Sequence, residues 1–295
     1  MISAPQPAAV PVPGGRVGAT VRLHPLLTGE FLAPPGFFKR PRGPLGFVRG
    51  LGLHVPRRQW RWCPIPALLV EHPSAGALLV DTGVDASALG DPTQQFGSLL
   101  PRLSELRVRA GQDAVSQARE RGVEPTAIGT VVLTHLHYDH AGAAGQLPHA
   151  TFLFDGREWA PAVRGRLLEG YRCETVDRPL DWRALDLTTA AGAGFSHAID
   201  LLGDGSVQVV STPGHSPGHV SVVLSTASGP VLFAGDAAYT RRAISEGHDQ
   251  LARADVAAYR ASLEAIRRWA ANNPAAPIIC SHDYEFWANP PALYA

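Results

Sequence analysis

The chain has 295 residues, of which 45% are hydrophobic and 18% charged, so it can bury a sizeable core and is unlike a disordered polymer. Its 26 Lys and Arg residues equal its 26 Asp and Glu residues, so the whole chain offers no global basic field to nucleic acid or anionic lipid. We therefore expect neither nucleic acid nor a membrane as a partner, and we favour a small neutral or weakly charged ligand.

The N-terminal residues 1–18 are rich in proline and lack both a basic start and a continuous apolar run. They make a poor signal peptide and are predicted to form an extended, flexible tail. No run of about 18 uncharged apolar residues follows, so no membrane span is expected. The three cysteines form no CxxC pair, which argues against a disulfide framework and favours a reducing, cytoplasmic compartment.

Short apolar runs that end at Gly, Pro or Asp predict the strands of a single domain over residues 19–295. These runs cover residues 65–70, 77–80, 131–133, 207–210, 220–224, 231–234 and 277–280. Residues 112–121 and 253–270 are predicted helices, the second with apolar side chains at every third or fourth position. The order favours an α/β (α+β) fold of two packed sheets with helices outside. The less regular segments 85–110 and 156–200 are predicted to cover a pocket.

A cluster of histidine and aspartate directly follows the predicted strand 131–133. On an extended backbone alternate side chains point the same way, so His135 and His137 can bind one ion. Asp139 and His140, on the turn that follows, then face a second position. Imidazole and carboxylate ligands suit zinc, with iron, manganese or cobalt as alternatives, and no thiolate is offered.

Three further polar residues stand where other predicted strands end. His215 follows the strand 207–210, Asp236 follows 231–234, and His282 follows 277–280. A site assembled on rigid elements draws its ligands from such positions. Together with the cluster at 135–140 they supply five histidines and two aspartates, enough for two ions with positions left for water and substrate.

This set of residues resembles the metallo-β-lactamase superfamily, whose signature HxHxDH stands at 135–140. The resemblance covers residues 20 to 290 and implies an αββα sandwich with two Zn²⁺ ions at one edge, between the sheets. It implies that one metal is bound by His135, His137 and His215, that the second is bound by Asp139, His140 and His282, and that Asp236 bridges them. Asp81, in the DTG sequence at 81–83, would orient ligands, and His219 is interpreted as structural.

Within the superfamily the chain is similar to the N-acyl-homoserine lactonases, which are quorum-quenching enzymes. The similarity lies in THLHYDHAG at 134–142, TPGHSPGH at 212–219 and DAAYT at 236–240, although residue 138 is Tyr where Phe is common. Aspartate rather than cysteine at the bridging position argues against true β-lactamases. Only thirteen residues follow His282, which argues against glyoxalase-type thioesterases.

The resemblance implies hydrolysis of a lactone ring by a hydroxide that bridges the two metals. Tyr239 would contact the substrate carbonyl, and Asp139 would take the hydroxide's proton and return it to the departing alkoxide. The closest alternative is a broader lactonase or aryl-ester hydrolase; a thioesterase, a phosphodiesterase and an iron-dependent oxidation rank lower. Phe96, Trp159 and Phe195 are candidates for contacts with an acyl tail, and a homodimer is one possible oligomeric state.

Overall fold

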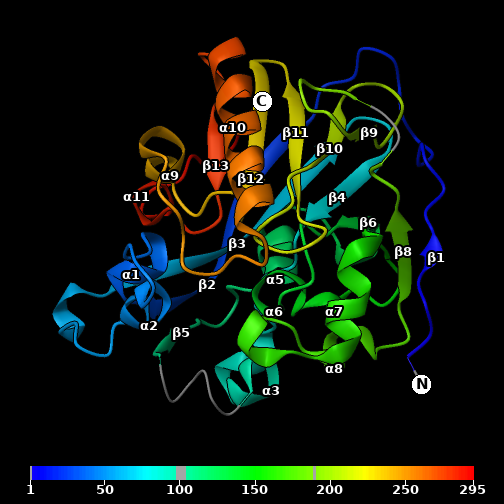
Figure 1. Cartoon of the computed structure of the whole chain (residues 1–295). Coiled ribbons are helices and arrows are strands. Elements are labelled where there is room, and N and C mark those ends of the chain that lie inside the picture. Colours follow the sequence, from blue (N-terminus) through cyan, green and yellow to red (C-terminus); the bar gives the residue numbers. More distant parts are fainter. Residues whose placement is uncertain (1, 98–103, 189–190) are drawn as a thin grey trace.

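Two β-sheets packed face to face form the centre of the computed structural model, which describes residues 2–97, 104–188 and 191–295 (Figure 1). Within these residues the first sheet has eight strands, in the order β1 (Gln6–Pro7), β8 (Asp181–Leu185), β7 (Thr151–Asp155), β6 (Ile128–Val132), β4 (Gly76–Val80), β3 (Arg61–His72), β2 (Arg22–Ala33) and β5 (Leu106–Arg107). The second has five, in the order β13 (Ile278–Cys280), β12 (Gly229–Gly235), β11 (Val220–Thr226), β10 (Val207–Ser211) and β9 (Ala198–Asp200).

Both sheets are mixed. In the first sheet, β4 pairs parallel with β6, β6 with β7, and β7 with β8. The strand β3 pairs antiparallel with both β2 and β4. In the second, only β13 pairs parallel, with β12. The carboxyl ends of β6, β12 and β13 each lead into a loop that carries predicted site residues.

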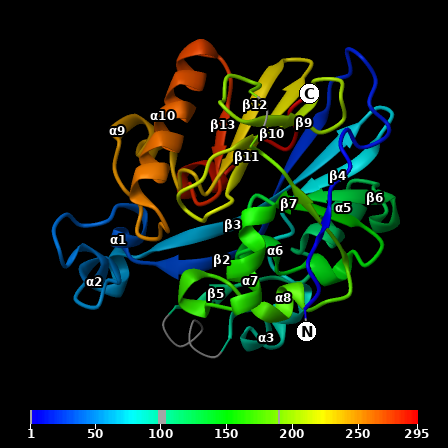
Figure 2. The same cartoon turned by 45° about the vertical axis from the view of Figure 1, so that its right-hand side comes forward.

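Helices cover the outer face of each sheet, which gives the expected αββα order of layers (Figures 1 and 2). On the first sheet lie α5 (Ala114–Glu120), α6 (Tyr138–Ala141), α7 (Trp159–Arg164) and α8 (Cys173–Val176), and on the second α9 (Arg241–Glu246) and α10 (Val256–Asn272). The remaining helices are α1 (Pro35–Phe38), α2 (Gly46–Gly50), α3 (Thr93–Phe96) and α11 (Tyr284–Trp287). Short 3-10 turns cover Arg57–Gln59, Ala86–Leu89, Pro125–Ala127, Ala144–Gln146, Gly156–Glu158 and Leu167–Glu169.

The alternation of side chains along the strands builds the core. In β3, Leu68 and Val70 face the second sheet, where they join Val222 and Phe233 in one buried cluster. Leu69, between them, faces the helices of the outer layer. Because a strand buried on both faces needs apolar residues at every position, the run from 65 to 70 is continuous rather than alternating.

The amphipathic helix predicted at 253–270 is α10, and its buried face carries Tyr259, Leu263, Ile266 and Trp269. The carboxylate of Asp255 accepts a hydrogen bond from the N–H of Ala258 at 2.9 Å, which caps the first turn. The helix begins three residues later than predicted because this cap fixes its start.

The longest strand that the sequence does not predict is β2. Its sequence, RLHPLLTGEFLA, mixes proline, glycine and polar residues, so it shows no clean period. It pairs with β3 over almost its whole length, and a register shift between Leu27 and Gly29 absorbs the irregularity. Partners in the neighbouring strand, and not local pattern, decide this element.

The N-terminal segment lies along the protein and is hydrogen-bonded to β8 and to the residue after β9 (Figure 2). Gln6 and Pro7 pair with β8, and the N–H of Val12 donates to the carbonyl of Leu201 at 2.7 Å. The segment is extended around Gln6 and Pro7 but turns at residues 13–14 and 17–18, and its contacts with the rest of the protein are not readable from a proline-rich composition. Of the segments expected to cover a pocket, residues 98–103 and 189–190 lie outside the described residues.

Candidate metal centre

The loop between β6 and α6 carries the HxHxDH sequence. The strand ends at Val132 and α6 begins at Tyr138, so Asp139 and His140 stand on the first turn of the helix. All four metal-binding candidates of this loop are buried; His135 and His140 have no exposed surface. Four ionisable side chains withdrawn from water in one loop need charge or hydrogen-bond partners to remain there.

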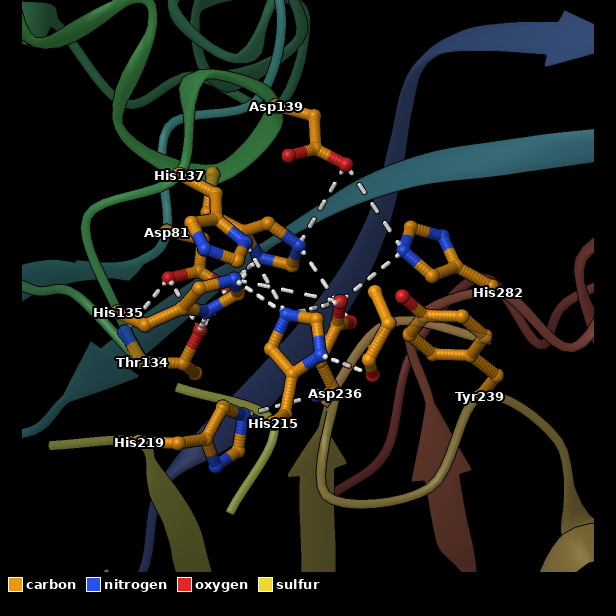
Figure 3. Close-up of polar contacts among 12 residues, drawn as sticks. Asp81, Thr134, His135, His137, Asp139, His215, His219, Asp236, Tyr239 and His282 are labelled. Atoms are coloured by element: carbon orange, nitrogen blue, oxygen red, sulfur yellow. Dashed lines mark hydrogen bonds and ion pairs between the residues drawn. The ribbon is translucent and has the colours of Figure 1, made fainter. Parts of the chain in front are cut away.

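The partners come from the second sheet. His215 lies in the loop after β10, Asp236 directly follows β12, and His282 follows β13. Figure 3 shows these three side chains pointing at the histidines and Asp139 from the opposite side. The seven predicted side chains therefore converge at one edge of the sandwich, between the two sheets.

Three imidazole nitrogens form the first group. His215 Nε2 lies 3.2 Å from His135 Nε2 and 3.0 Å from His137 Nδ1. Burial, together with the charge of neighbouring imidazoles, lowers the pKa of all three rings below the usual histidine range. Neutral rings with nitrogen lone pairs directed at a common point are the form of histidine that ligates metals.

Asp139, His140 and His282 form the second group. One Asp139 carboxylate oxygen lies 3.8 Å from Nε2 of His140 and 3.8 Å from Nε2 of His282. Both rings are oriented by a contact at their other nitrogen. His140 Nδ1 lies 2.8 Å from the carboxylate of Asp81, and His282 Nδ1 donates to the carbonyl of Pro64 at 2.7 Å. These contacts leave the two Nε2 atoms facing the centre.

Asp236 stands between the two groups. Its Oδ2 lies 3.2 Å from His215 Nε2 and 3.2 Å from His282 Nε2, while its Oδ1 lies 3.4 Å from His140 Nε2. Burial alone would raise the pKa of this carboxyl, but the surrounding imidazoles hold the pKa well below its usual range. The Oδ2 atom of this carboxylate thus faces both groups, and its Oδ1 faces the second group alone.

The donor set fits a pair of cations. Among the described residues, three triads have ligand atoms all within 4.8 Å of one another: His135, His137 and His215; His135, His140 and Asp236; Asp139, His140 and His282. His140 Nε2 and Asp236 Oδ1 are buried and make no hydrogen bond, a state that costs about 1–3 kcal/mol per group unless something else binds them. A cation between the groups would satisfy both atoms.

A set of buried residues around the centre holds its members in place. Asp81 accepts hydrogen bonds from the N–H and the hydroxyl of Thr134 in addition to its contact with His140. It adopts φ 60°, a left-handed conformation that aspartate tolerates better than most residues. His219 accepts at Nε2 from the N–H of Asp236 at 2.9 Å. Asp81 and His219 therefore orient other site residues, as the sequence suggests.

Two orienting residues are missed by the sequence analysis. Gln250 is fully buried; its amide nitrogen donates to the Asp236 carbonyl at 2.8 Å, and its amide oxygen accepts from the N–H of Tyr239 at 3.1 Å. Glu158, also fully buried, accepts from the N–H of Leu136 at 3.1 Å and from the N–H of Gly218 at 2.6 Å. Neither residue belongs to a spacing pattern, so no local signal could find it.

Tyr239 lies beside the centre with its hydroxyl directed toward the cluster (Figure 3). Its ring stacks on Phe37, with centroids 4.7 Å apart, and meets the His282 ring edge-on, also at 4.7 Å. Burial, reinforced by the negative charge of Asp236, raises the pKa of the phenol well above its usual value. The hydroxyl therefore stays protonated and can donate a hydrogen bond.

The three aromatic residues named as candidates for acyl contacts lie in different places. Phe96 packs edge-on against Tyr138 at 5.2 Å, one residue from Asp139. Trp159 packs on Phe154 in the outer layer of the first sheet, and Phe195 belongs to the apolar cluster under α10. Trp159 and Phe195 thus pack in the apolar clusters of the outer layers, and their contact with an acyl tail stays a prediction.

The comparison with protein families decides the wider assignment. The family model described as the metallo-beta-lactamase superfamily matches residues 60–282, a range that contains all seven converging residues. The chain belongs to the metallo-beta-lactamase superfamily. Among curated relatives, the N-acyl homoserine lactonase AttM of Azorhizobium caulinodans is 31% identical over 230 residues, which cover 76% of this chain and 83% of the relative.

Solved structures of two lactone hydrolases share the fold. An N-acyl homoserine lactone hydrolase with the product N-hexanoyl-L-homoserine at its metal centre has a TM-score of 0.72 and 22% identity, covering 91% of this chain and 96% of its own. AidC, a dizinc quorum-quenching lactonase, has a TM-score of 0.61 and 16% identity, and the match covers 96% of this chain and 91% of AidC. The predicted αββα metallo-β-lactamase fold and the resemblance to the lactonases are thus confirmed.

Proposed function

We propose that this protein is a dinuclear metallohydrolase that opens the lactone ring of N-acyl-homoserine lactones. The observation that carries the proposal is the position of Asp236, whose carboxylate lies between the two ligand groups with Oδ2 facing both, and Tyr239 follows three residues further along. The relative AttM supports the choice of substrate, because it is an N-acyl homoserine lactonase and it aligns over three quarters of this chain.

The seven converging residues would hold the metals. His135, His137 and His215 would bind one ion, Asp139, His140 and His282 the other, and Asp236 both. We propose Zn²⁺ for both positions because the donors are imidazole nitrogens and carboxylate oxygens, and because the structural neighbour AidC is a dizinc enzyme. When bound, two such cations lower the pKa of a water enough to supply a nucleophile at neutral pH and offset the developing negative charge.

The chain's own side chains would perform the remaining steps. The nucleophile adds to the lactone carbonyl carbon, and the protonated hydroxyl of Tyr239 donates a hydrogen bond to the oxygen on which negative charge develops. The ring C–O bond then breaks, and the Asp139 carboxylate carries a proton from the nucleophile to the departing alkoxide. The product is the open N-acyl-homoserine with one carboxylate and one hydroxyl, so each turnover releases one proton to neutral solution.

Two segments that the sequence analysis expects to cover the site would frame the substrate. The N–H of Tyr138 donates to the carbonyl of Gly170 at 2.9 Å, and the amide of Gln95 donates to the carbonyl of Tyr138 at 2.8 Å. Both contacts fix the loop that carries Asp139. We infer that the 85–110 and 156–200 segments shape the approach to the centre, and that the enzyme works in the cytoplasm, where its three free cysteines stay reduced.

A proton-release assay tests the proposal. Protein loaded with two equivalents of Zn²⁺ is offered N-hexanoyl- and N-decanoyl-homoserine lactone, a simple γ-lactone, an aryl ester, a thioester and a phosphodiester. The proposal expects kcat/KM for the acyl-homoserine lactones to exceed that for every other substrate. A higher kcat/KM for the aryl ester would assign the protein to the broader ester hydrolases, and activity only with iron bound would refute the zinc assignment.

A further inference from the structure

Residues 34–61, which run from the end of β2 to the first residue of β3 and contain α1 and α2, combine exposed apolar side chains with uncompensated positive charge. We call them the 34–61 lobe; Figures 1 and 2 both show α1 and α2 standing off from the sheets beyond the ends of β2 and β3. Ten large hydrophobic side chains are exposed among the described residues, and half of them lie in nine consecutive positions of this lobe: Leu45, Phe47, Val48, Leu51 and Leu53. Their exposed fractions run from 42% to 72%.

The charge of the lobe is entirely positive. Residues 31–70 contain no Asp or Glu, and they include seven cations: Lys39, Arg40, Arg42, Arg49, Arg57, Arg58 and Arg61. Lys39 pairs with Glu246 at 3.0 Å. In the part of the chain that the structure describes, Arg42, Arg49, Arg58 and Arg61 form no ion pair with a carboxylate. The whole-chain balance of 26 cations and 26 anions therefore conceals one strongly basic region on an otherwise acidic protein.

We propose that the 34–61 lobe binds the surface of an anionic lipid bilayer. Leucine, valine and phenylalanine side chains would enter the boundary between headgroups and acyl chains, while the arginines would remain among the phosphates. The excess of acidic residues on the rest of the protein would repel the same surface, so the protein would bind through this lobe in one orientation. No helix in the described ranges is long and apolar enough to cross a membrane.

Charge favours this partner over the alternatives. A second copy of the chain docked lobe to lobe about a twofold axis would place one set of arginines against another, with no carboxylate in the lobe to pair with them. Nucleic acid would satisfy the arginines but would leave aliphatic side chains such as Leu45, Val48 and Leu51 in water, because bases stack on planar groups. An anionic bilayer provides both phosphate charge and apolar depth.

The inner side of the lobe is built into the candidate metal centre. The ring of Phe37 stacks on that of Tyr239, and the backbone carbonyl of Phe37 accepts a hydrogen bond from the N–H of Leu251. The N–H of Arg40 donates to the carbonyl of Asp249. These contacts hold the turn that carries Gln250. Membrane binding by the lobe does not depend on the chemistry of the site. The advantage of membrane binding rests on the proposed function. An acyl-homoserine lactone that is dissolved in the bilayer by its apolar tail would leave the bilayer beside Phe37.

Vesicle cosedimentation of the full chain tests the proposal. At low salt the protein should pellet with vesicles of phosphatidylcholine and phosphatidylglycerol, and it should remain in solution with vesicles of phosphatidylcholine alone. Addition of 0.5 M NaCl should release it, because the Debye length at this salt concentration is only about 4 Å. Arg42→Gln/Arg58→Gln should lower the partition coefficient about 25-fold, at about fivefold per cation. Leu51→Gln/Leu53→Gln should lower it roughly tenfold by removing the buried apolar contact.

The matched control is Val256→Gln/Arg268→Gln, which removes one exposed apolar residue and one exposed cation from α10. It should pellet like the wild type, and all variants should keep the wild-type melting temperature because the changed side chains are exposed. Equal binding to both kinds of vesicle, or no loss in the lobe variants, would overturn the proposal. So would a dimer in sedimentation velocity that the lobe variants abolish, or duplex DNA bound in the absence of vesicle binding. None of these measurements uses catalysis, so a failed lactonase assay leaves their result unaffected.

Discussion

The side-chain amide of Gln250 donates to the backbone carbonyl of Asp236 across 2.8 Å. Through its oxygen the same amide accepts from the N–H of Tyr239, and its nitrogen also lies 3.2 Å from Nδ1 of His215. One uncharged, fully buried side chain therefore contacts the backbone of Asp236, a histidine of the first group and the backbone of Tyr239.

Gln250→Leu should weaken metal binding without touching a metal ligand. The substitution leaves the Asp236 carbonyl and the Tyr239 N–H buried without partners, which should cost about 2–4 kcal/mol of unfolding free energy. Metal affinity should fall by about 10- to 100-fold because the ligands lose their orientation. Denaturant unfolding and a zinc titration measure the two effects.

The matched control is Gln117→Leu. Gln117 also donates to two backbone carbonyls, those of Leu27 and Gln112, but it lies on α5, away from the centre. It should lose stability and retain metal affinity. If both leucine variants bound zinc like the wild type, Gln250 would be only a stabilising residue.

Asp236→Ala should separate the two ligand groups. It removes the carboxylate directed at both groups, so the protein should hold fewer than two zinc equivalents after dialysis, and its metal affinity should fall by at least about 10²-fold. Elemental analysis and the proton-release assay should show metal and activity lost together. Asp113→Ala, which removes the N-terminal cap of α5, should retain both. Full activity with two bound metals in Asp236→Ala would refute the bridging role.

Tyr239→Phe should lower turnover and leave the metals in place. The hydroxyl is the group proposed to stabilise the developing oxyanion, a contribution of about 3–4 kcal/mol, so kcat should fall by about 10²-fold or more. The ring that stacks on Phe37 is retained, so KM and zinc content should change little. A variant with unchanged kcat would show that Tyr239 serves packing alone.

Asp204 should make stability depend on pH below pH 4. Burial pushes its pKa up, but hydrogen bonds from the Ser206 hydroxyl and the Arg16 N–H outweigh this and lower the pKa to about 2, against about 3.9 unfolded. A depressed pKa contributes stability above the unfolded value, and that stability is lost as pH falls through the folded value. Asp204→Asn should therefore be about 1–2 kcal/mol less stable than the wild type at pH 7.

The difference between the two proteins should shrink between about pH 4 and pH 2, because the wild-type carboxyl becomes protonated there. Urea unfolding at pH 7, 4, 3 and 2 measures it. A constant difference over this range would mean that the substitution acts through shape and not through charge. Arg16 belongs to the N-terminal segment, so the same experiment reports how firmly Asp204 holds that segment to the protein.

The sequence by itself determined the local features of this protein. Apolar runs predicted β3, β4, β6, β10, β11, β12 and β13, because a strand buried on both faces must be apolar along its length. The spacing of His135, His137, Asp139 and His140 predicted a ligand cluster, since side-chain direction follows from backbone period within a few residues. Positions at strand ends then pointed to His215, Asp236 and His282.

Only the tertiary structure decided what depends on residues far apart in the chain. Gln250 and Glu158 contact the site mainly through hydrogen bonds to backbone groups, which other polar residues could also make, so no sequence pattern marks them. The strand β2 exists because β3 accepts its hydrogen bonds across a bulge, against its own irregular sequence. The position of Asp236 between two ligand groups follows from packing one sheet on the other, and that contact joins residues nearly a hundred positions apart.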